Sequence, residues 1–189
     1  MVEELPKDPM DVTFGNDSGC CIFVPESTND LNNGIFVPVY LLDLNIRLFA
    51  VYRLENGGDK KHRMGLVVAF DTHTENGRNI LACNSLELSA YGVAGGKPAL
   101  CKLTNYVEDW LIGYARRHRY HGVAMGSHSY NTSANFSGRK GDVVRQTLIF
   151  NTEGEALNPF YSDIFDWDSE NALMKTRENA CYWLDKTDE

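Results

Sequence analysis

Residues 79–126 read NILACNSLELSAYGVAGGKPALCKLTNYVEDWLIGYARRHRYHGVAMG and decide the fold. Residues 79–89 have the short apolar pattern of a strand, and from residue 98 the apolar spacing becomes helical. Residues 122–126 then follow as a short buried strand. A strand, a helix and a strand of these lengths predict a parallel crossover connection. The helix at 98–119 carries one apolar stripe at three- and four-residue steps: Leu100, Leu103, Val107, Trp110, Leu111 and Tyr114.

Upstream of this unit, short apolar runs rich in β-branched and aromatic residues predict strands at 20–24, 35–42, 46–54 and 64–70. The runs 35–42 and 46–54 are separated by Asp43-Leu44-Asn45, which favours a hairpin. We expect these strands to be mostly antiparallel, because the connections between them are short.

Downstream, residues 127–141 are polar and predict a loop, and 143–151 predict a further strand. An apolar side over 168–185 predicts a C-terminal amphipathic helix. The expected fold class is therefore α/β (α+β): a mixed, largely antiparallel sheet with a central helix and a C-terminal helix. We expect a single domain over 1–189, with an N-terminal arm at 1–18 and an acidic C-terminal extension with a helix at 152–189.

The composition is that of a globular protein: of 189 residues, 43% are hydrophobic and 23% are charged. These values exclude a disordered chain and a coiled-coil rod. No apolar run reaches the roughly 18 residues that span a bilayer, and the start lacks a signal-peptide pattern, so we expect a cytoplasmic protein without a membrane contact.

Charge is unevenly distributed along the chain, whose net charge is −8. Residues 97–150 carry 8 basic and 3 acidic side chains, whereas residues 151–189 carry 3 basic and 10 acidic ones. The acidic total disfavours a general nucleic-acid binder. We expect the basic middle to pair with the acidic tail in the fold, or to hold a phosphate-bearing ligand locally.

Cysteine usage argues against a disulfide framework and against a metal centre. The five cysteines are odd in number, and no CxxC motif occurs among them. We therefore expect reduced thiols and neither zinc nor another metal.

The turn before the helix reads Ser89-Ala90-Tyr91-Gly92-Val93-Ala94. Together with the order of elements over about residues 35–151, it resembles the GCN5-related N-acyltransferase fold. In that family a Q/R-x-x-G-x-G/A turn and the N-terminus of the next helix hold the pyrophosphate of an acyl-CoA. Gly92 and Ala94 match that pattern, and Ser89 stands where Gln or Arg is usual. The resemblance thus implies acyl-CoA (acetyl-CoA) as co-substrate, held by Ser89, Gly92, Ala94, Gly95, Gly96 and Lys97.

A second likeness to the family follows the short strand. The family often has Asn-x-x-Ala near the thioester with a Tyr shortly afterwards, and Asn131-Thr132-Ser133-Ala134 matches the first part. The usual Tyr position falls near Ser137-Gly138. The resemblance therefore implies a cofactor contact for Asn131, and Tyr130 is our candidate for the catalytic tyrosine, with Tyr161 as a substitute.

Glu87 is the candidate general base. In Leu86-Glu87-Leu88, strand alternation places Glu87 on the face opposite the two leucines. Acyl transfer to an amine needs a base that takes a proton from the attacking nitrogen, and a carboxylate on the central strand has that chemistry.

Three functions remain open. The leading one is an acyl-CoA-dependent N-acyltransferase, or a catalytically degenerate relative, acting on a small-molecule or protein amine. The first alternative is a non-catalytic module that binds a protein partner through its basic middle or its acidic, aromatic tail. The second is a cysteine hydrolase that uses Cys20 or Cys21, which follow a glycine turn, with a downstream His to lower the pKa of the thiol.

Overall fold

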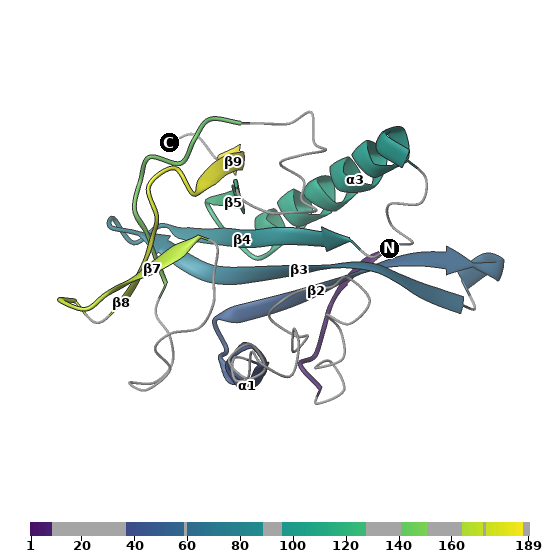
Figure 1. Cartoon of the computed structure of the whole chain (residues 1–189), viewed down its shortest axis with the longest axis horizontal. Coiled ribbons are helices and arrows are strands. Elements are labelled where there is room, and N and C mark those ends of the chain that lie inside the picture. The colour runs from purple at the N-terminus through teal and green to yellow at the C-terminus, as the bar shows by residue number, and fades with distance from the viewer. Residues whose placement is uncertain are drawn as a thin grey trace, which may run out of the picture.

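The protein has an α+β fold in which one mixed, mostly antiparallel sheet lies between two helices (Figure 1). The helices are α1 (Val37–Leu42) and α3 (Gly96–Arg117), and a short 3₁₀ turn, η3, spans Asn56–Gly58. The computed structural model describes residues 1–8, 37–58, 60–88, 96–127, 141–150, 164–171 and 173–186. The strands are β1 (Val2–Glu4), β2 (Ile46–Glu55), β3 (Lys60–Thr74), β4 (Asn79–Leu88), β5 (Gly122–Gly126), β6 (Leu148–Phe150), β7 (Phe165–Asp168), β8 (Leu173–Thr176) and β9 (Cys181–Lys186).

The long strand β3 organises the sheet, whose order is β7-β8-β6-β3-β4-β5-β9. On one edge β3 pairs with β4, and on the other it pairs first with β2 and then with β6. Strand β1 adds to the outer edge of β2. All described pairings are antiparallel except that of β4 with β5.

The predicted crossover is confirmed. Strand β4, helix α3 and the parallel strand β5 follow one another along the chain, and their bounds lie close to the predicted ones. Helix α3 carries Arg116 and Arg117 in its last turn, where cations interact favourably with the helix dipole. Within the described residues, no helix has the length and apolar character needed to cross a membrane.

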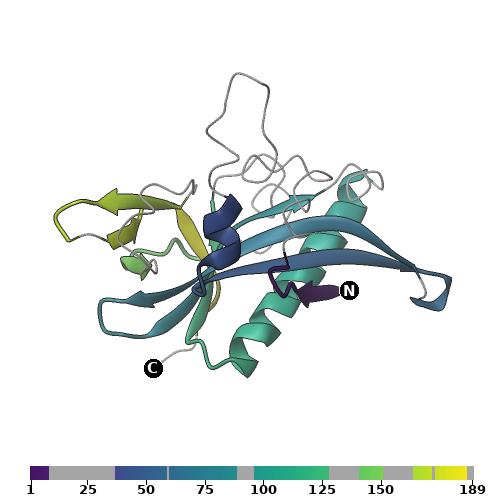
Figure 2. The same cartoon turned by 90° about the horizontal axis from the view of Figure 1, so that it is seen from below.

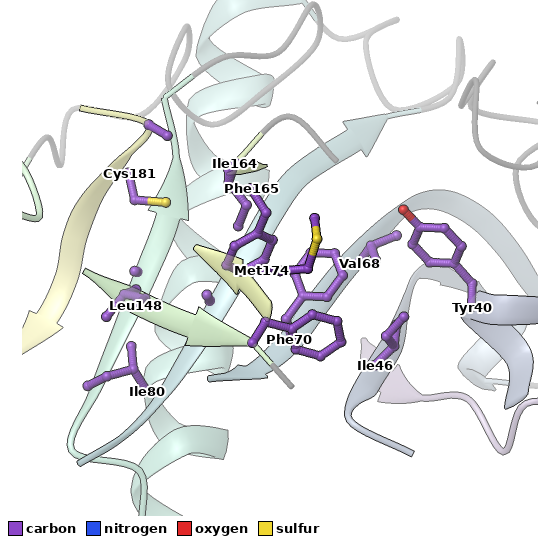
Figure 3. Close-up of a cluster of buried hydrophobic side chains, with 14 of the residues drawn as sticks. Tyr40, Ile46, Val68, Phe70, Ile80, Leu148, Ile164, Phe165, Met174 and Cys181 are labelled. Atoms are coloured by element: carbon purple, nitrogen blue, oxygen red, sulfur yellow. The ribbon is translucent and has the colours of Figure 1, made fainter. Parts of the chain in front are cut away.

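Each face of the sheet has its own hydrophobic cluster. The α3-facing cluster joins Val107 and Leu111 of the helix to side chains such as Phe49 and Val67 of the strands. The opposite cluster lies under α1 and under β6 to β8, as the close-up in Figure 3 shows. Its labelled members are Tyr40, Ile46, Val68, Phe70, Ile80, Leu148, Ile164, Phe165, Met174 and Cys181. Because both faces are buried at the middle of the sheet, residues 65–70 of β3 and 80–83 of β4 are continuously apolar rather than alternating.

A hydrogen-bonded ion network ties the N-terminal strand to the helix. Arg47 of β2 donates to both carboxylate oxygens of Asp71, at 2.8 and 2.7 Å, and to Glu4 at 2.8 Å. The hydroxyl of Tyr114 donates to the other Glu4 oxygen at 2.8 Å, and that of Tyr120 donates to Asp71. The hydrogen bond to Asp71 is the main cause of the raised pKa of Arg47. The network therefore connects β1, β2, β3 and α3 around one guanidinium group.

Two predicted elements near the N-terminus are wrong. The strand expected at 35–42 is a helix over Val37–Leu42, because Pro38 cannot donate to a sheet ladder but fits the first turn of a helix. The expected hairpin turn is instead a helix-to-strand turn, in which Asn45 N donates to Asp43 Oδ1 at 2.9 Å. The arm predicted over 1–18 is also not all loop, since Val2–Glu4 forms β1.

The predicted C-terminal helix over 168–185 is also wrong. This stretch instead forms β8 and β9, which are separated by a turn in which Asn179 has a φ of 57°. Residues that suggested a helical side are used by the sheet instead: Leu173 lies opposite Asp168, and Trp183 opposite Ala124. Pairing with two strands therefore overrides the local helical spacing.

The strand expected over 143–151 is shorter than predicted. Val143 forms an isolated bridge to Tyr182, and the regular strand is β6, Leu148–Phe150. The strand predicted at 20–24 lies outside the described residues, as does most of the loop predicted at 127–141.

Leu111→Ala tests the burial of α3. Leu111 is fully buried, whereas Tyr106 on the same helix is 48% exposed. We expect Leu111→Ala to lower the free energy of unfolding by about 2–5 kcal/mol, and Tyr106→Ala to lower it by less than about 1 kcal/mol. Urea unfolding followed by circular dichroism measures both. Equal losses would contradict the placement of the helix.

Candidate functional site

Strand β4 contains a bulge at Asn84. In the ladder with β3, Val68 lies opposite Ser85 and Ala69 lies opposite Cys83, so Asn84 is the extra residue. Asn84 is buried, with an exposure of 2%. Bulges of this kind re-aim side chains or end a pairing. The bulge therefore interrupts the regular pairing of β4 with β3 at Asn84.

The pairing of β4 with β5 ends at the same point. The parallel ladder runs from Ile80 opposite Gly122 to Cys83 opposite Met125, while β4 itself continues to Leu88. In the part of the chain that the structure describes, no strand pairs with residues 84–88 on the β5 side. Among the described strands, residues 85–88 therefore pair with β3 alone.

Gly126 follows Met125, the last residue of β5 that pairs with β4, and lies very close to the bulge. A Cβ atom at this position would lie 2.0 Å from the carbonyl oxygen of Asn84 and 2.9 Å from Cγ2 of Ile164. Any side chain here would push the two strands apart. Glycine is thus required by close approach of the two backbones.

The helix that follows β4 presents its N-terminus near the end of that strand. Strand β4 ends at Leu88 and α3 begins at Gly96, which has a φ of +69°. Figure 1 shows the end of β4 and the start of α3 at the same end of the molecule. The first turn of α3 contains no acidic residue, so its free N–H groups favour an anion.

Glu87 lies in the part of β4 beyond the end of the β5 ladder. Its neighbours Leu86 and Leu88 belong to the α3-facing cluster, and Glu87 lies opposite Leu66, which belongs to the other cluster. Its side chain is partly exposed. The structure thus places the predicted base on the sheet face opposite α3.

Most of the other predicted site residues lie outside the described residues: Ser89, Gly92, Ala94, Gly95, Tyr130 and Asn131. For Lys97 the structure gives the helical backbone but not the side chain. Glu87 and Gly96 are the predicted residues that it describes in full.

Sequence reasoning missed two polar residues on the inner face of α3. Thr104 and Glu108 are completely buried, one helical turn apart, beside Val107 and Leu111. The Thr104 hydroxyl has no hydrogen-bond partner among the described residues. In the sequence, Thr104 and Glu108 can be recognised as polar residues within the apolar stripe of the helix.

The bulge at Asn84 could also have been recognised in the sequence. The spacing of apolar residues on β4 changes from two residues to three between Cys83 and Leu86.

Other depressions in the described surface are built differently. One of ≈ 300 Å³ lies beside Asp71, His118 and Tyr120, but the Asp71 carboxylate is already held by Arg47 and Tyr120. Depressions of ≈ 500 and ≈ 600 Å³ flank residues 143–146. Within the described ranges, no group of three metal-ligating side chains occurs.

The described cysteines are free thiols. Burial raises the pKa of Cys181 to about 12 and raises that of Cys83 further, so both thiols are neutral at physiological pH. Cys101 is half-buried. Cys20 and Cys21, the predicted nucleophiles of the hydrolase alternative, lie outside the described residues.

No protein-family model matches the chain, and no curated protein matches it either.

Gly126→Ala tests the close approach of β4 and β5. The new Cβ would clash with a backbone oxygen, and we expect a loss of at least about 1–3 kcal/mol in the free energy of unfolding. Gly113→Ala is the matched control, because a Cβ there meets the mobile end of Arg117 at 3.3 Å and alanine favours a helix. Thermal unfolding should therefore separate the two variants. A neutral Gly126→Ala would show that the strands lie further apart.

Proposed function

We propose that the protein is an acyl-CoA-dependent N-acyltransferase, or a relative that has kept this fold and lost the chemistry. The observation that carries the proposal is the stretch of β4 from Asn84 to Leu88. It leaves the β5 ladder at a bulge, carries a carboxylate, and leads into the N-terminus of a long helix. The resemblance to N-acyltransferases inferred from the sequence over about residues 35–151 is the second support for the proposal.

The residues present suit an acyl-CoA in two respects. An anionic pyrophosphate favours a helix N-terminus without acidic side chains, which α3 has. Beyond the β5 ladder, the backbone of β4 would offer donors and acceptors to the amides of the pantetheine arm. Glycines before the helix, of which Gly92 and Gly95 are two, would allow phosphates to approach the backbone.

Glu87 would act on the acceptor amine. Acyl-CoA supplies an acyl group activated as a thioester. The amine nitrogen forms a bond to the acyl carbon, the bond from that carbon to sulfur breaks, and the nitrogen loses a proton. We assign the acceptance of that proton to Glu87, directly or through a water. The partial exposure of its side chain on the face opposite α3 supports this role. Tyr130 remains the candidate donor of a proton to the leaving thiolate.

The interaction-module alternative is weakened by one contact. Arg116 at the end of α3 donates to both carboxylate oxygens of Asp185 at 3.1 Å. The basic middle and the acidic tail thus meet within the fold, as expected from their charges. This pairing reduces the charge that the end of the helix offers to a partner.

Calorimetry with coenzyme A and acetyl-CoA tests cofactor binding. We expect heat of binding for the intact protein and weaker binding for Gly92→Val, since a side chain would block backbone approach to the phosphates. Thr147→Val, at the far end of the sheet before β6, is the control. No heat and no thermal shift at millimolar ligand would refute the proposal.

Glu87→Gln tests the base, because it keeps the shape of the side chain and removes the proton acceptor. We expect turnover of an amine substrate to fall by roughly 10²–10⁴-fold with cofactor affinity nearly unchanged. Glu178→Gln, at an exposed position, is the control. If no amine is acylated and Glu87→Gln changes stability alone, the interaction module becomes the better account. Charge reversal of Arg116, Arg117 and Arg119 would then test the partner surface.

A further inference from the structure

The hairpin formed by β2 and β3 extends beyond the rest of the sheet. Pairing of β3 with β4 ends at Gly65 opposite Leu88, whereas pairing of β2 with β3 continues to Glu55 opposite Lys60. Figures 1 and 2 both show this hairpin projecting past the end of β4. We call residues 52–63 the β2–β3 arm.

The β2–β3 arm is basic, although the protein as a whole is acidic. The arm contains four cationic residues, two acidic residues and one histidine, in a chain of net charge −8. The side chains of Arg53 and Lys61 are 67% and 46% exposed. The cations are Arg53, Lys60, Lys61 and Arg63. Such a local reversal of sign attracts an anionic partner.

One face of the arm combines cations with apolar groups. Tyr52 lies opposite Arg63, and Leu54 lies opposite Lys61, so the four side chains share one face. The ammonium group of Lys61 lies 5.3 Å from the ring centroid of Tyr52, and Leu54 is 45% exposed. This face therefore suits a peptide with acidic and apolar side chains better than a purely anionic polymer.

The same face continues to the candidate base. Tyr52 packs against the cluster that contains Leu66, and Leu66 lies opposite Glu87. Arg63 is three residues from Leu66 along β3 and Lys61 is five residues away. At about 3.3 Å per residue, the two cations lie roughly 10 and 17 Å from Glu87 along the strand.

The ion pair that Lys61 already makes is replaceable. Its ammonium group donates to Glu3 of β1 at 2.9 Å, and both side chains are exposed, 46% for Lys61 and 37% for Glu3. An exposed pair of this kind contributes little stability. A carboxylate of a bound partner would therefore compete with Glu3 at small cost.

We infer that the β2–β3 arm binds the acidic segment of a polypeptide acceptor whose N-terminal amine then lies at Glu87. This inference rests on the proposed function, since it names the acceptor of that same site. An extended peptide also advances by about 3.3 Å per residue. The acidic side chains are therefore expected three to five residues after the amine.

Fluorescence anisotropy with a defined peptide tests this binding. The probe is a dodecapeptide with a free N-terminal amine, acidic residues at its fourth to sixth positions and a C-terminal fluorophore. We expect it to bind the intact protein, and the Asn/Gln version of the peptide to bind more weakly by at least about tenfold. The double variant Lys61→Glu/Arg63→Glu should bind the acidic peptide more weakly by a similar factor. Circular dichroism checks its fold, and Lys61→Gln/Arg63→Gln serves if reversal prevents folding.

Arg145→Glu/Lys186→Glu makes the same change in net charge at the other end of the molecule and is the matched control. Glu3→Gln is the most specific variant, because removing the competing carboxylate should tighten binding of the acidic peptide. Equal losses in the arm variant and the control, or no effect of Glu3→Gln, would overturn the inference. Tighter, arm-dependent binding of a single-stranded oligonucleotide than of the peptide would overturn it too.

The readouts separate this inference from the proposed function. Binding of the acidic peptide needs no acyl-CoA, and the arm variants should leave the heat of coenzyme A binding unchanged. Coenzyme A binding without arm-dependent peptide binding would overturn the inference alone. Arm-dependent peptide binding in a protein that binds no coenzyme A would refute the acyltransferase and leave a docking surface for acidic peptides.

Discussion

The parallel pairing of β4 with β5 is the constraint on which the rest of the structure depends. Antiparallel neighbours are joined by short turns, but a parallel partner requires the chain to return across the sheet. Helix α3 makes that return and covers one face, so α1 and strands β6 to β8 cover the other. Because the ladder stops at Cys83, the remainder of β4 has no strand partner on the β5 side among the described residues.

The two ends of this sheet differ in the charged groups that they carry. Around Arg47, carboxylates and tyrosine hydroxyls saturate one another and fasten β1 to α3. At the other end, the carboxylate of Glu87 and the cations of the β2–β3 arm lie along one face. The first end is built for stability. Our proposals concern the second, where Glu87 and the exposed Lys61 lie on one face of the sheet.

The sequence predicted what short-range patterns encode. A helical stripe across residues 98–119 located α3 because its spacing is sustained over several turns. Alternation with Leu86 and Leu88 likewise predicted the sheet face on which Glu87 lies. The helix predicted at 168–185 was wrong because partners distant in the chain decide β8 and β9. Local spacing likewise does not reveal that Gly126 approaches Asn84. The roles given to Tyr130, Asn131 and residues 89–97 stay predictions.

A titration of the protein with coenzyme A, followed by two-dimensional amide proton–nitrogen NMR, tests the central claim most directly. The claim is that the part of β4 beyond the β5 ladder and the N-terminus of α3 form one binding site. It predicts that the amide signals of residues 84–88 and of the first turn of α3 shift together, with one dissociation constant. Unchanged signals there, or shifts confined to residues 143–147 beside the depressions near β9, would contradict it.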